Sequence, residues 1–462
     1  MGLSKAGLRR QEGAEKVAGT TQYTADLEIA GLLHVQLVLS HLPSALIRRV
    51  DGAAARDVPG VVAVLGGSDL PEVDIAGPDK PLAVDRVYYA GQPVVAVIAE
   101  SAAAAEDGAA LVEIEYDELP PVVELDVATL DTAPLVMPAD DESEADEASI
   151  HGASAAADGA PDERPRNVSG IAHLKRGDVE SALAKADVVV KASYRIAGVH
   201  HAFLEPHVCS VRPEPDGGLT IWAPTQGPFF VRDHVAEVTG IPLSKISVHP
   251  MPVGGGFGGK VELLEPLMAL LALKLRRPVR LELSRSHEFL MGRPAPGAAL
   301  DLELGASREG ALAGLRARFR FDNGATAGWH GGLTAQFLAG SYRLPAYDVQ
   351  GMEVSTNKTP AEAYRAPGAP QAFFALESAL DELAVKLDMD PIDLRLRNVS
   401  REGDPMPDGG TLPRVASVEA LEMAKTHPLY TGALAPGEAV GVALGTWGGA
   451  RTPAAAGCRV EP

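Results

Sequence analysis

The residues best suited to chemistry form a glycine-rich segment with one phenylalanine inside it and a lysine at its end. In order they are Gly254-Gly255-Gly256-Phe257-Gly258-Gly259-Lys260. Glycines let a backbone approach a ligand closely, and successive N–H groups in such a turn attract anions. The segment therefore predicts a ligand-binding loop. A tight structural turn is the alternative.

The same loop formally matches two nucleotide-binding motifs. Gly254, Gly256 and Gly259 have the spacing of the dinucleotide fingerprint, and the segment follows a P-loop up to its final position. There, Val261 replaces the hydroxyl side chain that would bind magnesium. Glu282 is only a loose candidate for the acid that the dinucleotide motif requires. A nucleotide- or phosphate-binding protein using loop 254–260 is thus the alternative function.

Three further side chains could contact a ligand at this loop. Phe257 stands among glycines, so we expect its ring to point toward a planar substrate or else into a core pocket. Gln226 could donate from a buried amide without adding charge, or it could simply cap a strand end. Arg365 offers a planar fork for an anionic or carbonyl oxygen, unless it forms an ion pair with Glu362 or Glu377.

A second group of reactive side chains comprises His200, His201, Glu205 and His207. On a strand, His201, Glu205 and His207 would share one face. Imidazole and carboxylate groups suit zinc or iron, so a metal site is one interpretation of this cluster. Ordinary hydrogen bonding at the start of a strand is the other.

Regular patterns predict the N-terminal elements. Residues 33–39 alternate as a half-buried strand does, and residues 61–65 and 93–99 are apolar enough for buried strands. Ser101 is expected to cap an Ala-rich helix, and residues 112–116 alternate again. These elements predict a mixed α/β unit.

The elements after residue 168 carry the candidate site residues. Residues 208–211 and 219–222 flank Asp216-Gly217, which is a hairpin signature. A helix is predicted after Gln226, a short strand at 246–248 and an apolar helix ending at Leu275. Asp390-Pro391 should open another helix. One long helix is predicted from an apolar stripe, which comprises Phe373, Leu376, Leu380, Leu383 and Leu387.

Composition excludes several classes of protein. Lys and Arg total 41 against 62 Asp and Glu, and the net charge of -21 would repel nucleic acid and anionic lipid. Cys209 and Cys458 are too few for a disulfide framework or for iron–sulfur clusters held by this chain alone. No secretory signal and no span-length apolar stretch is found, so we expect a cytoplasmic protein without a membrane partner.

Taken together, these segments resemble the molybdenum hydroxylase family, typified by xanthine dehydrogenase, aldehyde oxidase and carbon monoxide dehydrogenase. Loop 255–260 looks like the family's loop beside the molybdenum. Residues 223–226 resemble the strand end whose Gln bonds an oxygen ligand of the metal, and residues 363–371 resemble the Arg-containing active-site loop. The helix start at 390–398 is similar too. Three N-terminal segments resemble the family's hammerhead domain: 19–27, 59–62 and 91–94.

The resemblance implies an α+β protein in four parts. Residues 1–137 would form an α/β hammerhead domain, 138–167 an acidic linker, and 168–425 the first molybdenum-cofactor-binding domain of mixed sheets and helices. Residues 426–462 would start a second domain that another chain completes. Within them, 455–462 resembles one arm of a hairpin whose return strand a partner would supply.

The resemblance also implies that the chain is a subunit of a molybdenum-dependent oxidoreductase and is inactive without partner chains. The enzyme would oxidise an N-heteroaromatic or aldehyde substrate, with water as the oxygen source. The cofactor would be a molybdenum-pterin, either plain or as the cytosine dinucleotide. Iron–sulfur clusters and FAD would lie on partner subunits, and the general-base Glu on a chain carrying the second molybdenum domain.

The resemblance assigns roles to particular residues. Gln226, Phe257 and Arg365 would be catalytic. These three residues and Gly258 would lie beside the metal without coordinating it. Gly256, Gly258 and Ala366 would join the first three in binding the cofactor. Val261 stands where xanthine-oxidising members carry a Glu, which argues against xanthine as the substrate.

Overall fold

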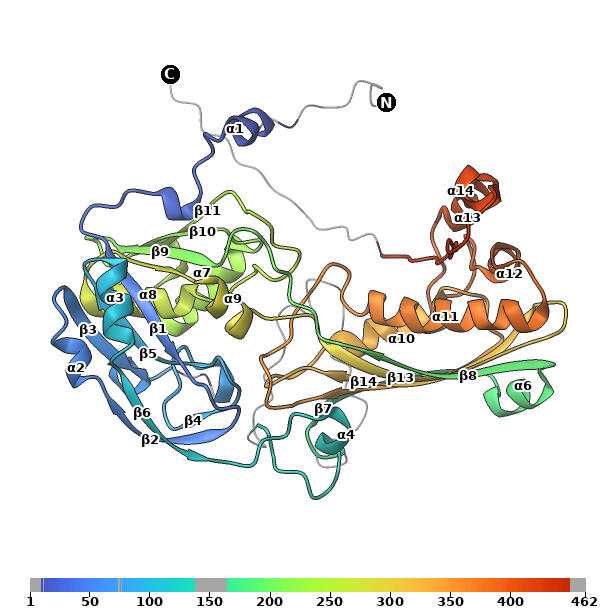
Figure 1. Ribbon diagram of the computed structural model, residues 1–462, viewed down its shortest axis with the longest axis horizontal. Coiled ribbons are helices and arrows are strands. Elements are labelled where there is room, and N and C mark those ends of the chain that lie inside the picture. Colours follow the sequence, from blue (N-terminus) through green and yellow to red (C-terminus); the bar gives the residue numbers. More distant parts are fainter. Residues whose placement is uncertain (1–9, 11, 74, 76, 138–163, 449–462) are drawn as a thin grey trace.

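The computed structural model describes residues 10, 12–73, 75, 77–137 and 164–448. They form two lobes, one built on a seven-stranded sheet and the other on a long five-stranded sheet (Figure 1). Mixed sheets and helices confirm the predicted α+β class. Most of the predicted acidic linker and the predicted hairpin arm at 455–462 lie outside the described residues.

The seven-stranded sheet joins strands from distant parts of the chain. β1 (Leu33–Leu39) runs parallel to β12 (Val279–Glu282) and antiparallel to β5 (Pro93–Ala99). Side chains of all three strands meet in one hydrophobic core. The remaining strands in sheet order are β11 (Ile246–Pro250), β10 (Leu219–Ala223) and β9 (Val208–Pro213) before β12, and β3 (Val61–Gly66) after β5.

The N-terminal predictions are confirmed, except that β3 is only partly buried, with Val62 45% exposed. Along β1, Leu33, Val35 and Leu37 are buried, and every residue of β5 is buried. The Ser101 hydroxyl accepts the Ala104 N–H at 3.2 Å and so caps α3 (Ala102–Ala109), which packs on β1 and β5. A small antiparallel sheet contains β4 (Arg86–Val87), β2 (Ala45–Asp51) and β6 (Glu113–Glu118).

Strand direction explains why two candidate site segments lie together. β10 and β11 are parallel, with Ala223 beside Pro250, so both strands end at the same edge of the sheet. Gln226 follows β10 and precedes α7 (Pro228–Thr239), while the glycine loop follows β11 and precedes α8 (Glu265–Leu275). The two helices pack against each other and bury apolar side chains in the same core.

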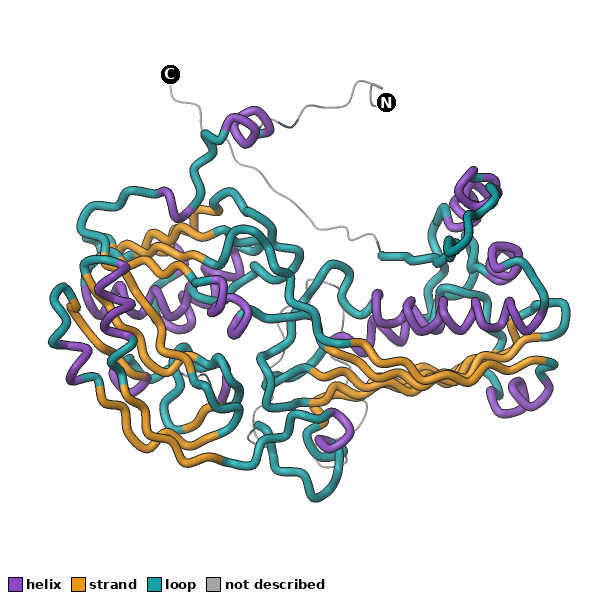
Figure 2. The backbone as a smooth tube through the Cα atoms, in the orientation of Figure 1, coloured by secondary structure: helices purple, strands orange, loops and turns teal. Residues whose placement is uncertain are grey.

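The second lobe has helices on both faces of its sheet. α10 (His330–Gly340) and α11 (Ala369–Leu387) cover one face, and α4 (Leu125–Ala128) and α6 (Val179–Lys185) lie on the other (Figures 1 and 2). Leu376, Leu380 and Leu383 of α11 are fully buried, as the apolar stripe predicts. The strand order is β7 (Val168–Arg176), β15 (Ala346–Val354), β14 (Leu312–Asp322), β13 (Gly297–Ala306) and β8 (Val188–Ile196).

The remaining helices are short. The Asp390 carboxylate accepts the N–H groups of Ile392 and Asp393 and so caps α12, as predicted. The short helices are α1 (Gly13–Ala18), α2 (Ala53–Arg56), α9 (Arg285–Met291), α12 (Pro391–Asn398), α13 (Ser417–Thr426) and α14 (Pro428–Thr431).

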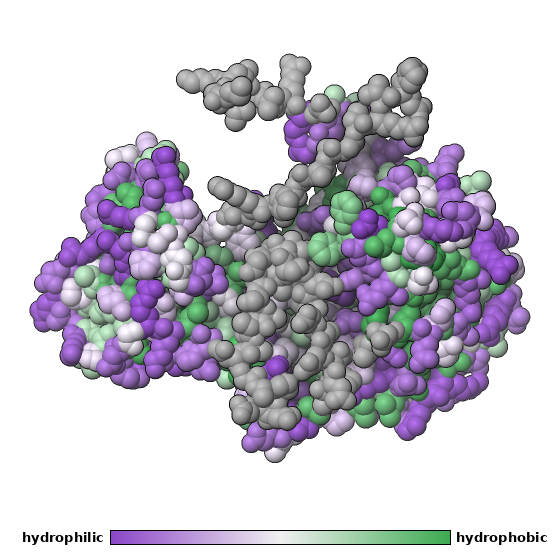
Figure 3. Space-filling view, turned by 180° about the vertical axis from the view of Figure 1, so that it is seen from behind, coloured by the Kyte–Doolittle hydropathy of each residue, from purple (hydrophilic) through white to green (hydrophobic). Residues whose placement is uncertain are grey.

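Across the ranges that the structure describes, no helix is both long enough and apolar enough to cross a bilayer. Seen from behind, hydrophilic side chains cover much of both lobes, with hydrophobic patches between them (Figure 3).

A buried acid in the second lobe gives the protein a pH-dependent stability. Glu353 accepts hydrogen bonds from the Asn323 amide and the Gly331 N–H, yet burial raises the pKa of its carboxyl from 4.5 to about 7. The native chain therefore keeps this proton to a higher pH than the unfolded chain does. Between these two values the unfolding free energy should fall as pH rises, because the native state binds more protons there.

We expect Glu353→Gln to remove that part of the pH dependence, since an amide does not ionise. Urea unfolding of both proteins from pH 4.5 to 7.5 checks this. The midpoint of the wild type should fall relative to that of the variant across the range. Parallel curves would contradict the assignment.

Candidate cofactor site

Gln226 and the glycine loop are joined by three hydrogen bonds. The Gln226 side-chain oxygen Oε1 accepts the N–H of Gly258 at 2.9 Å and of Lys260 at 3.3 Å, and the Gln226 N–H donates to the Lys260 carbonyl at 2.7 Å. The side chain is exposed, not buried as expected, and no described residue accepts from its Nε2. The amide nitrogen is therefore free to donate to a ligand while the oxygen is held.

The loop that carries Arg365 lies directly against the glycine loop. The Arg365 N–H donates to the Phe257 carbonyl at 2.8 Å. A Cβ atom at Gly258 would lie only 2.5 Å from the Ala363 carbonyl oxygen. That oxygen accepts a hydrogen bond from His201 Nε2 at 2.9 Å. The fold thus brings all three predicted segments together.

The ion pairs considered for Arg365 are both wrong. Glu362 pairs with Arg293, and Glu377 pairs with the buried Arg395 at 2.7 Å. Arg365 itself is exposed, so its guanidinium is available for an oxygen of a ligand.

Backbone strain is concentrated at the site. Phe257, Arg365 and Ala366 have φ angles of 55°, 24° and 68°, in the left-handed region that non-glycine residues rarely adopt. Such conformations persist where surrounding contacts enforce them, typically at functional sites. Phe257 is 47% exposed, so the prediction that its ring fills a core pocket is wrong.

Two anion-binding groups of the loop, the Gly254 N–H and the Lys260 ammonium, are already occupied by the protein. Glu205 Oε2 accepts the Gly254 N–H at 2.7 Å and pairs with Lys260 Nζ at 2.8 Å. Burial lowers the pKa of Lys260, an effect that Glu205 opposes. A P-loop lysine must reach its phosphates, whereas this one is 2% exposed. The geometry does not favour the nucleotide-binding alternative.

The histidine-containing segment is a loop and not the strand that we expected. His201, Glu205 and His207 contact three different partners: the Ala363 carbonyl, Lys260 and Glu288. Burial lowers the pKa of His201 to about 4, so this ring is neutral at physiological pH. In the described part of the chain, no group of three or more His, Cys, Asp and Glu side chains could hold a metal ion. The hydrogen-bonding interpretation is the correct one.

The chemistry of the donors indicates what the site could hold. An amide nitrogen, a guanidinium and an aromatic ring lie at the loop, and among the described residues no cluster of three or more His, Cys, Asp and Glu side chains could hold a bare cation. Such a set fits a group that presents oxygen atoms and brings its own metal ligands, as a molybdenum-pterin does. The residues present therefore fit the implied cofactor.

Comparison with known proteins defines the class to which this fold and site belong. The model of the molybdopterin cofactor-binding domain matches residues 160–399. The model of the aldehyde oxidase and xanthine dehydrogenase a/b hammerhead domain matches residues 18–120. The chain therefore belongs to the xanthine dehydrogenase and aldehyde oxidase family of molybdenum hydroxylases, as its motifs predict.

Two relatives differ in how much of their length is matched. The chain is 32% identical over 418 residues to the xanthine dehydrogenase molybdenum-binding subunit of Escherichia coli O157:H7, covering 86% of this chain and 52% of that protein. It is 29% identical over 423 residues to the nicotinate dehydrogenase large molybdopterin subunit of Eubacterium barkeri, covering 90% and 93%. The chain thus spans about half of the first relative and nearly all of the second.

Solved structures share the same fold. Quinoline 2-oxidoreductase from Pseudomonas putida superimposes with a TM-score of 0.77 at 28% identity, covering 90% of this chain and 53% of that one. Aldehyde oxidoreductase from Desulfovibrio gigas gives a TM-score of 0.79 at 26% identity, covering 90% and 45%.

Proposed function

We propose that the chain is the molybdenum-cofactor subunit of a multi-subunit hydroxylase. The observation that supports this most is that Gln226 and Arg365 both contact the glycine loop. Two backbone N–H groups of the loop donate to the Gln226 side-chain oxygen, and the Arg365 N–H donates to a loop carbonyl. These residues would hold the cofactor together with Ala366. When bound, the molybdenum-pterin would supply a two-electron redox centre.

The chain's own residues would position the substrate and stabilise oxygen atoms of the bound group by hydrogen bonds. The Gln226 amide would donate to an oxygen of the bound group, and the Arg365 guanidinium would bind an anionic or carbonyl oxygen. The exposed ring of Phe257 would restrict how a flat substrate lies against the site. The fixed N–H groups of the loop would hold Gln226 and so keep its donor aimed, with no reorganisation during the reaction.

We further propose an N-heteroaromatic or aldehyde substrate, with water as the oxygen source. The apolar side chain of Val261, next to the glycine loop, supports a substrate other than xanthine, and nicotinate and quinoline enzymes are among the relatives. The proposal includes a cytosine-dinucleotide form of the pterin, iron–sulfur and FAD subunits, a chain supplying the general-base Glu, and a cytoplasmic location. It also includes the domain division at residues 137, 167 and 425.

Metal and cofactor analysis tests the proposal. The chain would be produced together with the polypeptide that completes the second molybdenum domain, and the assembly would be purified. We expect stoichiometric molybdenum and pterin, and no binding of ATP by the chain alone. An assembly without molybdenum, together with tight ATP binding by the chain, would contradict the proposal.

A further inference from the structure

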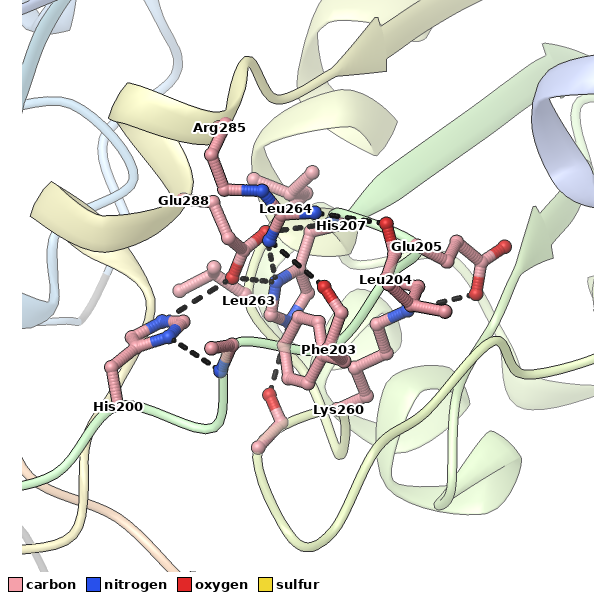
Figure 4. Close-up of polar contacts among 12 residues, drawn as sticks. His200, Phe203, Leu204, Glu205, His207, Lys260, Leu263, Leu264, Arg285 and Glu288 are labelled. Atoms are coloured by element: carbon pink, nitrogen blue, oxygen red, sulfur yellow. Dashed lines mark hydrogen bonds and ion pairs between the residues drawn. The ribbon is translucent and has the colours of Figure 1, made fainter.

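Residues 200–207 form a loop that contacts the glycine loop, and several of its side chains are drawn in Figure 4. It is fixed by α9, because Arg285 donates to the carbonyls of Phe203 and Leu204, both at 2.8 Å. Glu288 of the same helix accepts the His207 N–H at 2.7 Å. The segment is therefore a rigid support for whatever it contacts.

Glu205 of this support holds both ends of the glycine loop. One carboxylate oxygen, Oε2, accepts the N–H of Gly254, the first residue of the loop, and the ammonium of Lys260, the last. The Lys260 side chain is 1% exposed and its ammonium lies 4.6 Å from the centre of the Phe203 ring. Since a buried ammonium needs a partner, Lys260 can stay in place only while Glu205 does.

His207 supplies a third attachment. Its Nε2 lies 3.0 Å from the Gly259 carbonyl and its Nδ1 lies 3.0 Å from a Glu288 oxygen. A carbonyl oxygen only accepts, so Nε2 donates to Gly259, while Nδ1 contacts the Glu288 carboxylate. Glu288 is fully buried, and although burial alone would raise the pKa of its carboxyl, hydrogen bonds from His200 and His207 hold this pKa well below its usual range. His207 thus links the glycine loop to Glu288 on α9.

We propose that Glu205 and His207 are positioning residues that hold the glycine loop in its site-forming shape before any cofactor binds. Neither residue needs to touch the cofactor. They fix Gly254, Gly259 and Lys260, and the segment between these points carries Phe257 and Gly258. The proposal rests on the proposed function for its purpose, but the contacts themselves require no cofactor.

Amide hydrogen exchange of the chain alone tests this support directly. In Glu205→Gln, the buried Lys260 loses its counter-charge, so we expect exchange in the peptide covering residues 252–262 to accelerate about tenfold or more. Exchange in β13, β14 and β15 should not change. Glu303→Gln is the matched control, because Glu303 also pairs with basic residues but lies on the distant five-stranded sheet, 3.1 Å from Lys191 and 3.2 Å from Arg316.

Two further variants keep the test decisive if Glu205→Gln folds poorly. Glu205→Gln combined with Lys260→Gln removes both charges and should recover at least half of the lost protection. His207→Asn should accelerate exchange at the C-terminal end of the loop, with His173→Asn as its control. Exchange of loop 254–260 within about twofold of wild type in both His207→Asn and Glu205→Gln would overturn the proposal. So would equal acceleration throughout both lobes.

The same variants separate this inference from the proposed function. In the assembled enzyme, Glu205→Gln should lower kcat more than it changes KM, while Glu303→Gln should change neither. A chain that binds no molybdenum-pterin but shows the predicted exchange would refute the proposed function and leave the positioning role intact. Full cofactor content, together with exchange that the Glu205 and His207 variants do not change, would refute the positioning role and leave the proposed function intact.

Discussion

Gln226→Glu is expected to lower kcat of the assembled enzyme by about 100- to 1000-fold, the usual effect of losing one preorganised donor. A carboxylate has the same shape as the amide and can still accept the N–H groups of Gly258 and Lys260, which lie 2.9 and 3.3 Å from Oε1. It cannot donate. Steady-state kinetics on enzyme of known molybdenum content measures the combined effect of losing the donor and adding a charge.

The control for this variant is Gln36→Glu, which makes the same change at a half-buried position on β1. It should leave kcat unchanged. If Gln226→Glu keeps kcat within about twofold of wild type at equal cofactor content, Gln226 does not donate during the reaction and the assignment is wrong.

Gly258→Ala is expected to destabilise the site and to separate its two loops. The residue has a φ of 105°, and an added Cβ would lie 2.5 Å from the Ala363 carbonyl oxygen. A left-handed conformation costs a non-glycine residue about 1–2 kcal/mol, and overpacking costs about 1–3 kcal/mol more. We therefore expect a loss of roughly 2–5 kcal/mol in unfolding free energy and the loss of bound cofactor.

Gly217→Ala is the matched control for the backbone effect. Gly217 lies in the β9–β10 turn with a φ of 82° and nothing within 4 Å of an added Cβ. It should lose only the conformational part, about 1–2 kcal/mol, and should keep the cofactor. Urea unfolding and cofactor content of the two variants measure the difference. Equal losses in both would mean that Gly258 is not in close contact with the Arg365 loop.

Many helices and strands of this fold could be predicted from the sequence, because short-range patterns of residues determine them. The period-two pattern of β1, the apolar run of β5 and the stripe on α11 each describe one buried face, and Ser101 and Asp390 cap helices as short-range chemistry requires. The motifs around Gln226, Phe257 and Arg365 also predicted which segments would meet.

The partners of those residues could not be predicted, because they depend on contacts between distant segments. Nothing in the sequence indicates that β1 pairs with β12, or that Glu288 on α9 holds His207. The charge of Lys260 and the acid of Glu205 suggested phosphate and metal binding respectively, yet they neutralise each other. Only the fold distinguishes a ligand-binding charge from one that is already paired.

The measurement that tests the central claim most directly is a cryo-EM map of the purified assembly. We expect density for a molybdenum-pterin against loop 256–258, with the Gln226 Nε2 and the ring of Phe257 beside the metal's ligands and a second polypeptide closing the opposite wall. A pterin bound far from this loop, with Gln226 and Arg365 facing solvent, would contradict the proposed function.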